Sequence, residues 1–211
     1  MADRIGIFGI SGQARDLADI AFHCGLTPVY VVRNSDEASD VDSIEVILEA
    51  DVLNHTEMSF AIGIGDPLIR KKIYERFGDR LNFRNLIHPH ASFGRGQIDR
   101  INQSQGVVVC AGVRMSNSIQ VGDFTLFNMN ATVGHDCVIE DFVTVSPGAC
   151  ISGNVHVGEA AWIGTGAIIN QGRPERKLQI GCGAMIGAGA VVLGDCEPAG
   201  TYVGVPARRI K

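Results

Sequence analysis

Large apolar residues recur at every sixth position in the C-terminal half of the chain. The members of this stripe are Val109, Met115, Val121, Phe127, Val133, Ile139, Val145, Ile151, Val157, Ile163 and Ile169. The residue after each is often Gly, Asn or Ser, as a turn after every short strand requires. An α-helix or a simple β-ladder has no period of six, whereas three hexads can close one coil of a three-sided prism. The pattern therefore predicts a left-handed parallel β-helix of hexapeptide repeats with one continuous aliphatic core.

The six-residue frame is interrupted at two places. It breaks after Asn170 and resumes at Ile180, which predicts that residues 171–179 bulge out as a loop. Before residue 107, Gln97 and Gln103 occupy positions where apolar residues are expected. We therefore expect an irregular first coil.

Residues 1–87 follow a different pattern, in which short apolar runs alternate with helical spacing. Strands are predicted over 4–8, 28–32, 59–64 and 83–87. Helices are predicted over 13–24 and from Pro67 onward, with Asp66 as the N-cap of the second. This alternation predicts an α/β, Rossmann-like domain with a parallel sheet over residues 1–87, followed by the β-helix domain over residues 88–211.

Composition excludes several classes of protein. The net charge of −5, without a cluster of Lys and Arg, argues against a nucleic-acid surface. The six cysteines are scattered singly and are expected to be reduced thiols. The histidines outside residues 128–137 show no metal-ligand spacing, and the HPH run at 88–90 is expected to mark the joint between the domains. With neither a signal peptide nor an apolar run of about 18 residues, we expect a cytoplasmic protein that does not contact the membrane.

Candidate chemistry is concentrated in residues 128–137. His135 lies two positions after the inward Val133 and is therefore expected on the outer side of the strand, beside Asp136. A neighbouring carboxylate favours the charged imidazole, which suits a general base. The alternative is a surface histidine without a catalytic role. Cys137 falls on the inward stripe and is expected to be a buried filler rather than a nucleophile.

The chain also resembles a known family. Residues 128–147, the GISG turn at 9–12, the segment IGIGDPLIRKKIYERF and the C-terminal TYVGVPARRI are together similar to the NeuD/PglD-like bacterial sugar acetyltransferases. This family includes sialic acid O-acetyltransferases and N-acetyltransferases of UDP-amino sugars. The resemblance implies a homotrimer in which acetyl-CoA lies along the β-helix between neighbouring subunits. It also implies that the N-terminal domain holds the nucleotide sugar and that transfer is direct, without an acyl-enzyme.

By position, the resemblance assigns roles to individual residues. It implies that His135 is the catalytic base and that Asp136 raises its basicity. The residues implied to bind the nucleotide sugar are Ser11, Gly12, Gln13, Arg33, Asn34, Gly65, Arg70 and Asn128. Those implied to bind acetyl-CoA are Thr144, Gly153 and Thr165, and Thr144 is also a candidate to support the oxyanion.

Three departures from the family pattern affect the substrate prediction. The family usually has histidine in place of Gln13, acidic residues in place of Arg33 and Asn34, and often histidine in place of Thr144. We therefore expect the same reaction with an altered acceptor or nucleotide. The Arg and Lys residues of the 171–179 loop are either solvated or available to the phosphates of CoA.

These observations leave four functions open. The leading expectation is an N-acetyltransferase acting on a nucleotide-linked amino sugar in bacterial surface glycan biosynthesis, and an O-acetyltransferase of sialic acid or another sugar is the nearest alternative. An NAD(P)-binding reductase is disfavoured because the turn at 9–14 lacks the G-x-G-x-x-G spacing and no acidic residue closes the second strand. A non-catalytic solenoid is the remaining alternative.

Overall fold

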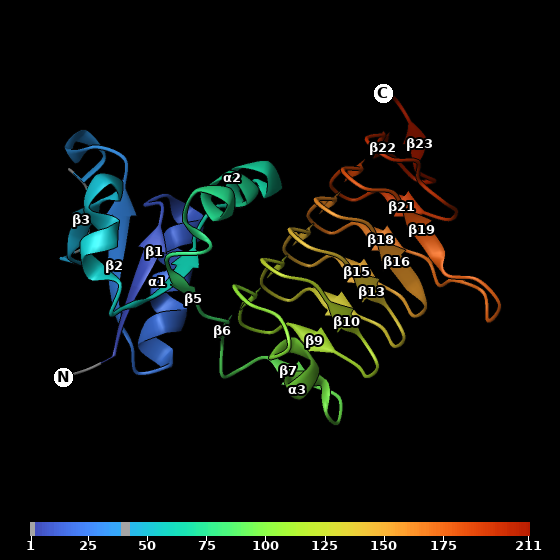
Figure 1. Cartoon of the computed structure of the whole chain (residues 1–211). Helices are drawn as coiled ribbons and strands as arrows, with labels where there is room; N and C mark the ends of the chain where they lie inside the picture. Colours follow the sequence, from blue (N-terminus) through green and yellow to red (C-terminus); the bar gives the residue numbers. More distant parts are fainter. Residues whose placement is uncertain (1–2, 39–42) are drawn as a thin grey trace.

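The computed structural model describes residues 3–38 and 43–211, which form an N-terminal α/β part and a C-terminal column of coils (Figure 1). The N-terminal part is a parallel sheet in the order β3-β2-β1-β4-β5. Its strands are β1 (Arg4–Phe8), β2 (Thr27–Val32), β3 (Val46–Leu48), β4 (Ser59–Ile62) and β5 (Asn82–Phe83). Its α-helices are α1 (Gly12–His23) and α2 (Pro67–Phe77), and two short 3-10 helices span Ser35–Ala38 and Glu49–His55. Within the described residues, no helix has the length and apolar character needed to cross a bilayer.

Most of the elements predicted for this part are confirmed within a few residues. The N-cap of α2 is confirmed as well, because the Asp66 carboxylate accepts hydrogen bonds from the amides of Leu68 (2.8 Å) and Ile69 (3.1 Å). The prediction missed β3, which has only three residues, all of them half-buried. A strand this short carries too few alternations to show a period.

The C-terminal part is a three-sided parallel β-helix. Its first face contains β6 (Leu86–Ile87), β8 (Val108–Val109), β11 (Leu126–Phe127), β14 (Thr144–Val145), β17 (Trp162–Ile163), β20 (Met185–Ile186), β22 (Thr201–Val203) and the antiparallel β23 (Arg208–Arg209). Its second face contains β7 (Ser92–Phe93), β9 (Arg114–Met115), β12 (Thr132–Val133), β15 (Cys150–Ile151), β18 (Ile168–Ile169) and β21 (Val191–Val192). Its third face contains β10 (Gln120–Val121), β13 (Val138–Ile139), β16 (Val155–Val157) and β19 (Leu178–Ile180).

The hexapeptide prediction is confirmed by the core. Every member of the predicted stripe from Val109 to Ile169 is buried in one hydrophobic cluster. Strands pair with those three hexads further on, as Phe127 does with Val145. The chain needs left-handed backbone at each corner, once per hexad, and Phe124 and Phe142 adopt it with φ of 54° and 58°.

Both predicted interruptions are also present. The first coil contains a short helix, α3 (Gln97–Ile101), in place of a strand on the third face. The fully buried Gln97 side chain donates to the carbonyl of Ile119 (2.8 Å) and accepts from its amide (3.0 Å), so it replaces a missing strand. The later insertion forms a loop between β18 and β19, closed by backbone hydrogen bonds between Arg173 and Arg176.

The prediction of one strand over 83–87 is wrong. Phe83 pairs with Phe60 in the N-terminal sheet, whereas Leu86 and Ile87 pair with β8 on the first face of the β-helix. The chain therefore enters the β-helix before residue 86, and the predicted boundary at 87/88 falls within its first coil. The apolar run looked continuous because both short strands bury their side chains.

The two parts are joined through the first face and its neighbouring corner. Figure 1 shows α2 extending from the sheet toward the coils. Arg70 of α2 is 2% exposed, and its guanidinium donates to the Thr144 hydroxyl (2.9 Å) and to five backbone carbonyls. These carbonyls belong to Phe124 (3.0 Å), Ile64 (3.1 Å), Gly65 (2.8 Å), Phe142 (2.6 Å) and Val143 (3.1 Å). Burial lowers the pKa of Arg70 to about 9, opposed by the Asp66 carboxylate, so the group is still charged at neutral pH.

A second contact at this joint involves the HPH run, as predicted. The ring of His88 lies 4.7 Å from that of His23 on α1, and the His88 amide donates to Val109 of the β-helix (2.8 Å). Burial, together with the neighbouring His23 and His90, lowers the pKa of His88, which favours a neutral ring. Among the described residues, no group of His, Cys, Asp or Glu side chains could hold a metal ion.

We expect Arg70→Met to destabilise the protein by about 3–5 kcal/mol, because it leaves several buried carbonyls without a donor. Denaturant unfolding would measure the loss. Lys72→Met is the matched control, since Lys72 is an exposed cation on the same helix. Equal unfolding midpoints for the two variants would contradict the assignment of Arg70 as the joint.

Candidate functional site

The predicted catalytic pair lies in the turn between β12 and β13. Val133 and Ile139 on either side point into the core, so the turn projects outward at the corner between the second and third faces. Nδ1 of His135 lies 2.7 Å from Oδ2 of Asp136, and about half of each side chain is exposed. Asp136 adopts left-handed backbone (φ 58°), a conformation that Asp tolerates better than most residues. The structure therefore brings His135 and Asp136 together on the surface.

The His135 ring lies against Gly153 in the next coil. A Cβ atom on Gly153 would come within 2.6 Å of His135 Nε2, so a larger residue there would displace the ring. Because Asp136 engages Nδ1, the nitrogen left for a reactant is Nε2. Gly153 was predicted to contact acetyl-CoA, and the structure places it directly beside the predicted base.

Cys137 is a buried filler, as predicted. Its side chain is fully buried, and its thiol donates to the carbonyl of Ser152 at 3.2 Å. Burial raises the pKa of this thiol, which keeps it protonated. All six cysteines of the chain are free thiols.

Arg70 and Thr144 do not lie near His135. Thr144 is 1% exposed, and its hydroxyl donates to the Gly65 carbonyl (2.7 Å) while it accepts from Arg70 (2.9 Å). The predictions that Arg70 binds the sugar and that Thr144 supports the oxyanion are not supported, because both groups are buried and already bonded. Thr144 precedes the inward Val145 on the first face, so its side chain points outward into the joint with α2.

Two of the predicted sugar-binding residues, Ser11 and Arg33, line one cavity. A space of about 270 Å³ at the carboxyl ends of β1 and β2 is lined by Phe8, Gly9, Ile10, Ser11, Val31, Arg33, Glu37, Glu49, Ile64 and Ile73. Ligands of open parallel sheets bind at these strand ends. Ser11 is the N-cap of α1 but makes no side-chain capping bond, and Gly12 begins the helix. Asn34 instead bonds Glu37, at 3.3 Å through its side-chain oxygen.

Gln13 and Asn128 approach the same thiol from the two parts of the chain. The Cys110 thiol donates to the Asn128 side-chain oxygen at 3.9 Å. Burial raises the pKa of Cys110 to about 12, and the neighbouring Gln13 side chain opposes this shift. Nε2 of Gln13 is buried and has no hydrogen-bond partner among the described residues. The Gln13 side chain thus lies beside the Cys110 thiol, where α1 meets the first face of the β-helix.

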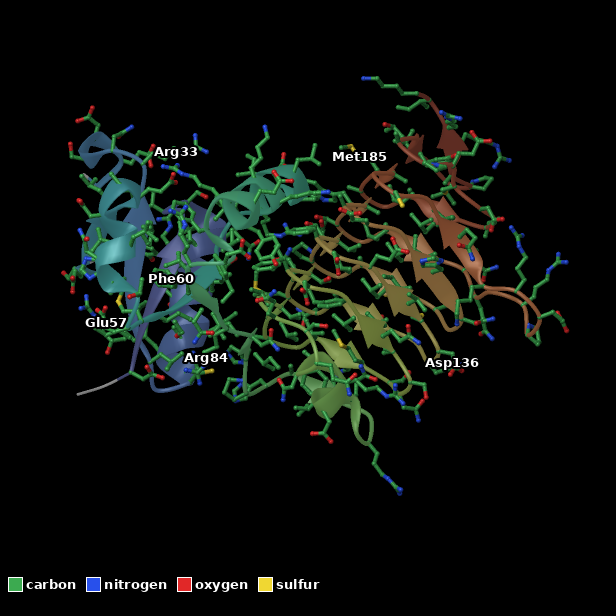
Figure 2. The ribbon with its side chains drawn as sticks, in the orientation of Figure 1. Arg33, Glu57, Phe60, Arg84, Asp136 and Met185 are labelled. Carbon is green, nitrogen blue, oxygen red and sulfur yellow. The ribbon has the colours of Figure 1, made fainter. Side chains whose placement is uncertain are left out.

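Within one chain, the cavity and His135 lie on different sides of the β-helix. The N-terminal part covers the first face and its corner with the third, whereas His135 projects from the corner opposite that face. Figure 2 shows Arg33 and Asp136 far apart, near opposite ends of the molecule. Thr165 is exposed in the turn between β17 and β18, at yet another corner.

The sequence analysis missed two residues next to the turn that carries the predicted catalytic pair. Lys177 donates to the Asp136 carbonyl and to Oδ1 of Asn154 (3.0 Å), and the Asn154 amide donates to the His135 carbonyl (2.8 Å). The only available signal was the position of the insertion, which interrupts the frame at the corner that His135 occupies.

Comparisons with known proteins show what the chain is similar to. Residues 4–77 match the family model described as the PglD N-terminal domain. The acetyltransferase domain of PglB from Neisseria gonorrhoeae FA1090, in complex with acetyl coenzyme A, superposes with a TM-score of 0.87 at 29% identity over the whole of both chains. The chain therefore resembles the NeuD/PglD-like family, in its N-terminal part by the family model and over its whole length by structure.

The descriptions of two further similar proteins name a nucleotide sugar. PerB from Caulobacter crescentus, in complex with CoA and GDP-perosamine, superposes with a TM-score of 0.85 at 26% identity over 100% of this chain and 99% of that one. GDP-perosamine N-acetyltransferase from Escherichia coli O157:H7 is 43% identical over 106 residues, which are 50% of this chain and 48% of that enzyme. The match thus spans about half the length of this curated relative.

We expect Gly153→Ala to lower kcat about tenfold, because the new Cβ displaces the His135 ring and errors of about 1 Å in position cost up to 10²-fold. Steady-state kinetics would measure the change. Gly148→Ala has open space at its Cβ but left-handed φ, so it tests backbone strain without contact to the ring. If Gly153→Ala kept full activity, the placement of the ring would be contradicted.

Proposed function

We propose that this protein transfers the acetyl group of acetyl-CoA to the amino group of a nucleotide-linked sugar in bacterial surface glycan biosynthesis. The observation that carries the proposal is the exposed His135–Asp136 pair, in which the carboxylate holds Nδ1 and leaves Nε2 for a reactant. The relatives support the two substrates, since one is described with acetyl coenzyme A and another with CoA and GDP-perosamine.

The proposed mechanism is direct transfer. His135 Nε2 takes a proton from the amine as the amine nitrogen attacks the thioester carbonyl. Asp136 stabilises the imidazolium that forms, as a carboxylate does within hydrogen-bond distance. When the tetrahedral intermediate collapses, the C–S bond breaks and the imidazolium returns the proton to the thiolate of CoA. The products are the acetamido sugar and free CoA.

Transfer also needs a second copy of the chain. The cavity at β1 and β2 and the His135 corner lie on different sides of one β-helix, so the sugar held by one N-terminal domain reaches the base of a neighbour. A homotrimer with active sites between subunits satisfies this requirement. Ile168, on the second face next to the His135 corner, is 46% exposed and is suited to such a contact.

The N-terminal sheet is the proposed Rossmann-like nucleotide-sugar unit. Its order β3-β2-β1-β4-β5 places the β1–α1 turn at the edge where such folds bind ligands. The Ser11 hydroxyl makes no capping bond and lines the cavity on this side, so it can donate to an anionic or carbonyl group.

O-acetylation of a sialic acid is the second candidate. The observation that favours it is Arg33, a cation at the cavity where the family usually has acidic residues. A guanidinium there is suited to a sugar carboxylate. A panel of UDP-, dTDP- and GDP-linked amino sugars against free and CMP-linked sialic acids, followed by release of the CoA thiol, distinguishes the two candidates.

We expect His135→Ala to lower kcat on the preferred acceptor by about 10²–10⁴-fold, because the general base is lost. The same thiol-release assay measures this change. His156→Ala is the matched control, since His156 also pairs with a carboxylate, that of Glu140 (2.7 Å), but through Nε2 and on the third face. Full activity of His135→Ala would show that the mechanism is wrong.

A further inference from the structure

The inserted loop between β18 and β19 lies at the corner that carries the predicted base. The turns at this corner follow β12, β15 and β18 in successive coils, and the third of them is the loop. In the first of these turns Asp136 is left-handed, and Asn154 is left-handed in the second (φ 58° and 60°). The loop therefore sits two coils above His135 on the same edge of the column.

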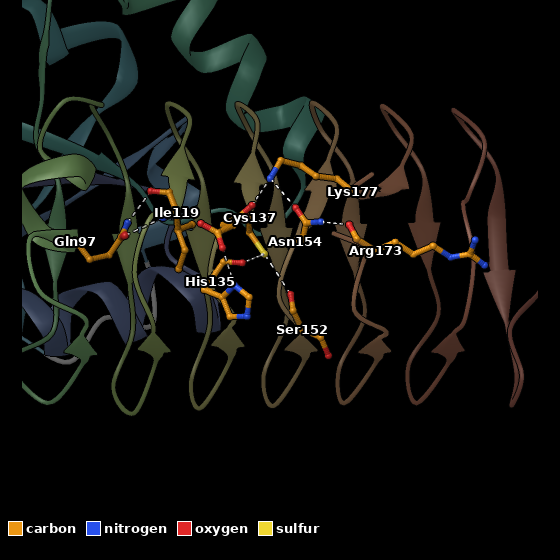
Figure 3. A network of polar contacts seen from close by, with 9 residues as sticks. Gln97, Ile119, His135, Cys137, Ser152, Asn154, Arg173 and Lys177 are labelled. Carbon is orange, nitrogen blue, oxygen red and sulfur yellow. Dashed lines mark hydrogen bonds and ion pairs between the residues drawn. The ribbon is translucent and has the colours of Figure 1, made fainter. Parts of the chain in front are cut away.

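Polar contacts connect the loop to the turn below (Figure 3). Lys177 Nζ donates to the Asp136 carbonyl and to Asn154 Oδ1 (3.0 Å). Asn154 Nδ2 donates to the carbonyl of Arg173 in the loop, and its backbone amide donates to the carbonyl of His135 (2.8 Å). Together, Lys177 and Asn154 bond the carbonyls of both members of the catalytic pair.

These bonds fix the direction of the two side chains. The orientations of the two peptide planes on either side of Asp136 determine where its carboxylate points, and the carboxylate must meet His135 Nδ1. At an exposed corner, carbonyls bonded only to water would allow these planes to rotate. A half-buried ammonium that bonds one of them, with a second bond to Asn154, removes that freedom.

The other two cations of the loop are directed elsewhere. Arg176 pairs with the Asp195 carboxylate. The side chain of Arg173 extends away from His135 in Figure 3, and only its carbonyl bonds Asn154. The contact with the catalytic turn is thus specific to Lys177 among these three.

We infer that Lys177 is a positioning residue for acetyl transfer: with Asn154, it holds the His135–Asp136 turn in its reactive geometry from the inserted loop. This inference rests on the proposed function, because it takes His135 as the base. It also gives the loop a role other than contact with the phosphates of CoA.

Steady-state kinetics of three loop variants test the inference. Lys177→Met keeps the length of the side chain but removes the donor, and we expect kcat to fall about tenfold with KM for both substrates within about twofold. Lys177→Arg retains donors and is expected to restore most of kcat. Arg173→Met removes a loop cation but keeps the carbonyl bond to Asn154, and is expected to match the unaltered protein. A rise in KM for acetyl-CoA with unchanged kcat in Lys177→Met would overturn the inference in favour of phosphate binding.

Asn154→Gly tests the same contact from its other side. Glycine accepts the left-handed backbone, so this variant removes the side-chain bonds and keeps the amide that bonds His135. We expect a similar fall in kcat, and in the double variant with Lys177→Met a loss smaller than the product of the two single losses. Independent, multiplicative losses would contradict the shared network.

Amide hydrogen exchange separates failure of this inference from failure of the proposed function. In Lys177→Met we expect the amides of Asp136 and Cys137 to exchange at least about tenfold faster, with an unchanged melting temperature. Full kcat and unchanged exchange, alongside an inactive His135→Ala, would overturn the positioning role alone. An active His135→Ala would overturn the proposed function, and exchange would still report whether Lys177 holds the turn.

Discussion

Parallel pairing between coils three hexads apart determines where every outward side chain of the β-helix lies. Each coil repeats the backbone of the coil below, and the inward aliphatic of each hexad stacks on the next to form one core. A corner residue therefore has a fixed height, a fixed side and a fixed neighbour above it. For this reason the His135 ring lies against Gly153, although Gly153 is three hexads further along the sequence. The stacked coils hold the corner residues in fixed positions. Outward side chains at the corners are therefore available to bind or react.

The same constraint separates the two functional regions. The N-terminal part occupies the first face and is held there by Arg70, whose guanidinium bonds the carbonyls of Phe124, Phe142 and Val143 beside that face. With that face covered, the opposite corner, which carries His135, remains exposed. In the proposed function this corner receives the thioester. The proposed active site is then completed by a neighbouring subunit rather than by closure within one chain.

The regular features of the structure were predictable from sequence, and the joints between them were not. The hexad stripe, the outward His135 and the buried Cys137 all follow from the period of six, which determines inside and outside directly. The role of Thr144 could not be read in this way. The period shows that it points outward, but not that α2 covers it. The boundary near residue 86 was missed because burial on both sides of it gives one apolar run. Lys177 lies in the segment where the period stops, so its contact with Asp136 depends on the path of an irregular loop.

The closure of the column at its two ends has a consequence for how the protein behaves at high concentration. A β-helix is a stack of strands with unpaired peptide groups at each end, and such edges template the addition of further chains. Here Gln97 bonds both peptide groups of Ile119 below the third face, and β23 runs antiparallel along β22 at the far end of the first. A strand from another molecule would meet an amide side chain at one of these edges and a strand of opposite direction at the other. Addition of a further parallel strand is therefore opposed at these two edges by the residues that cover them.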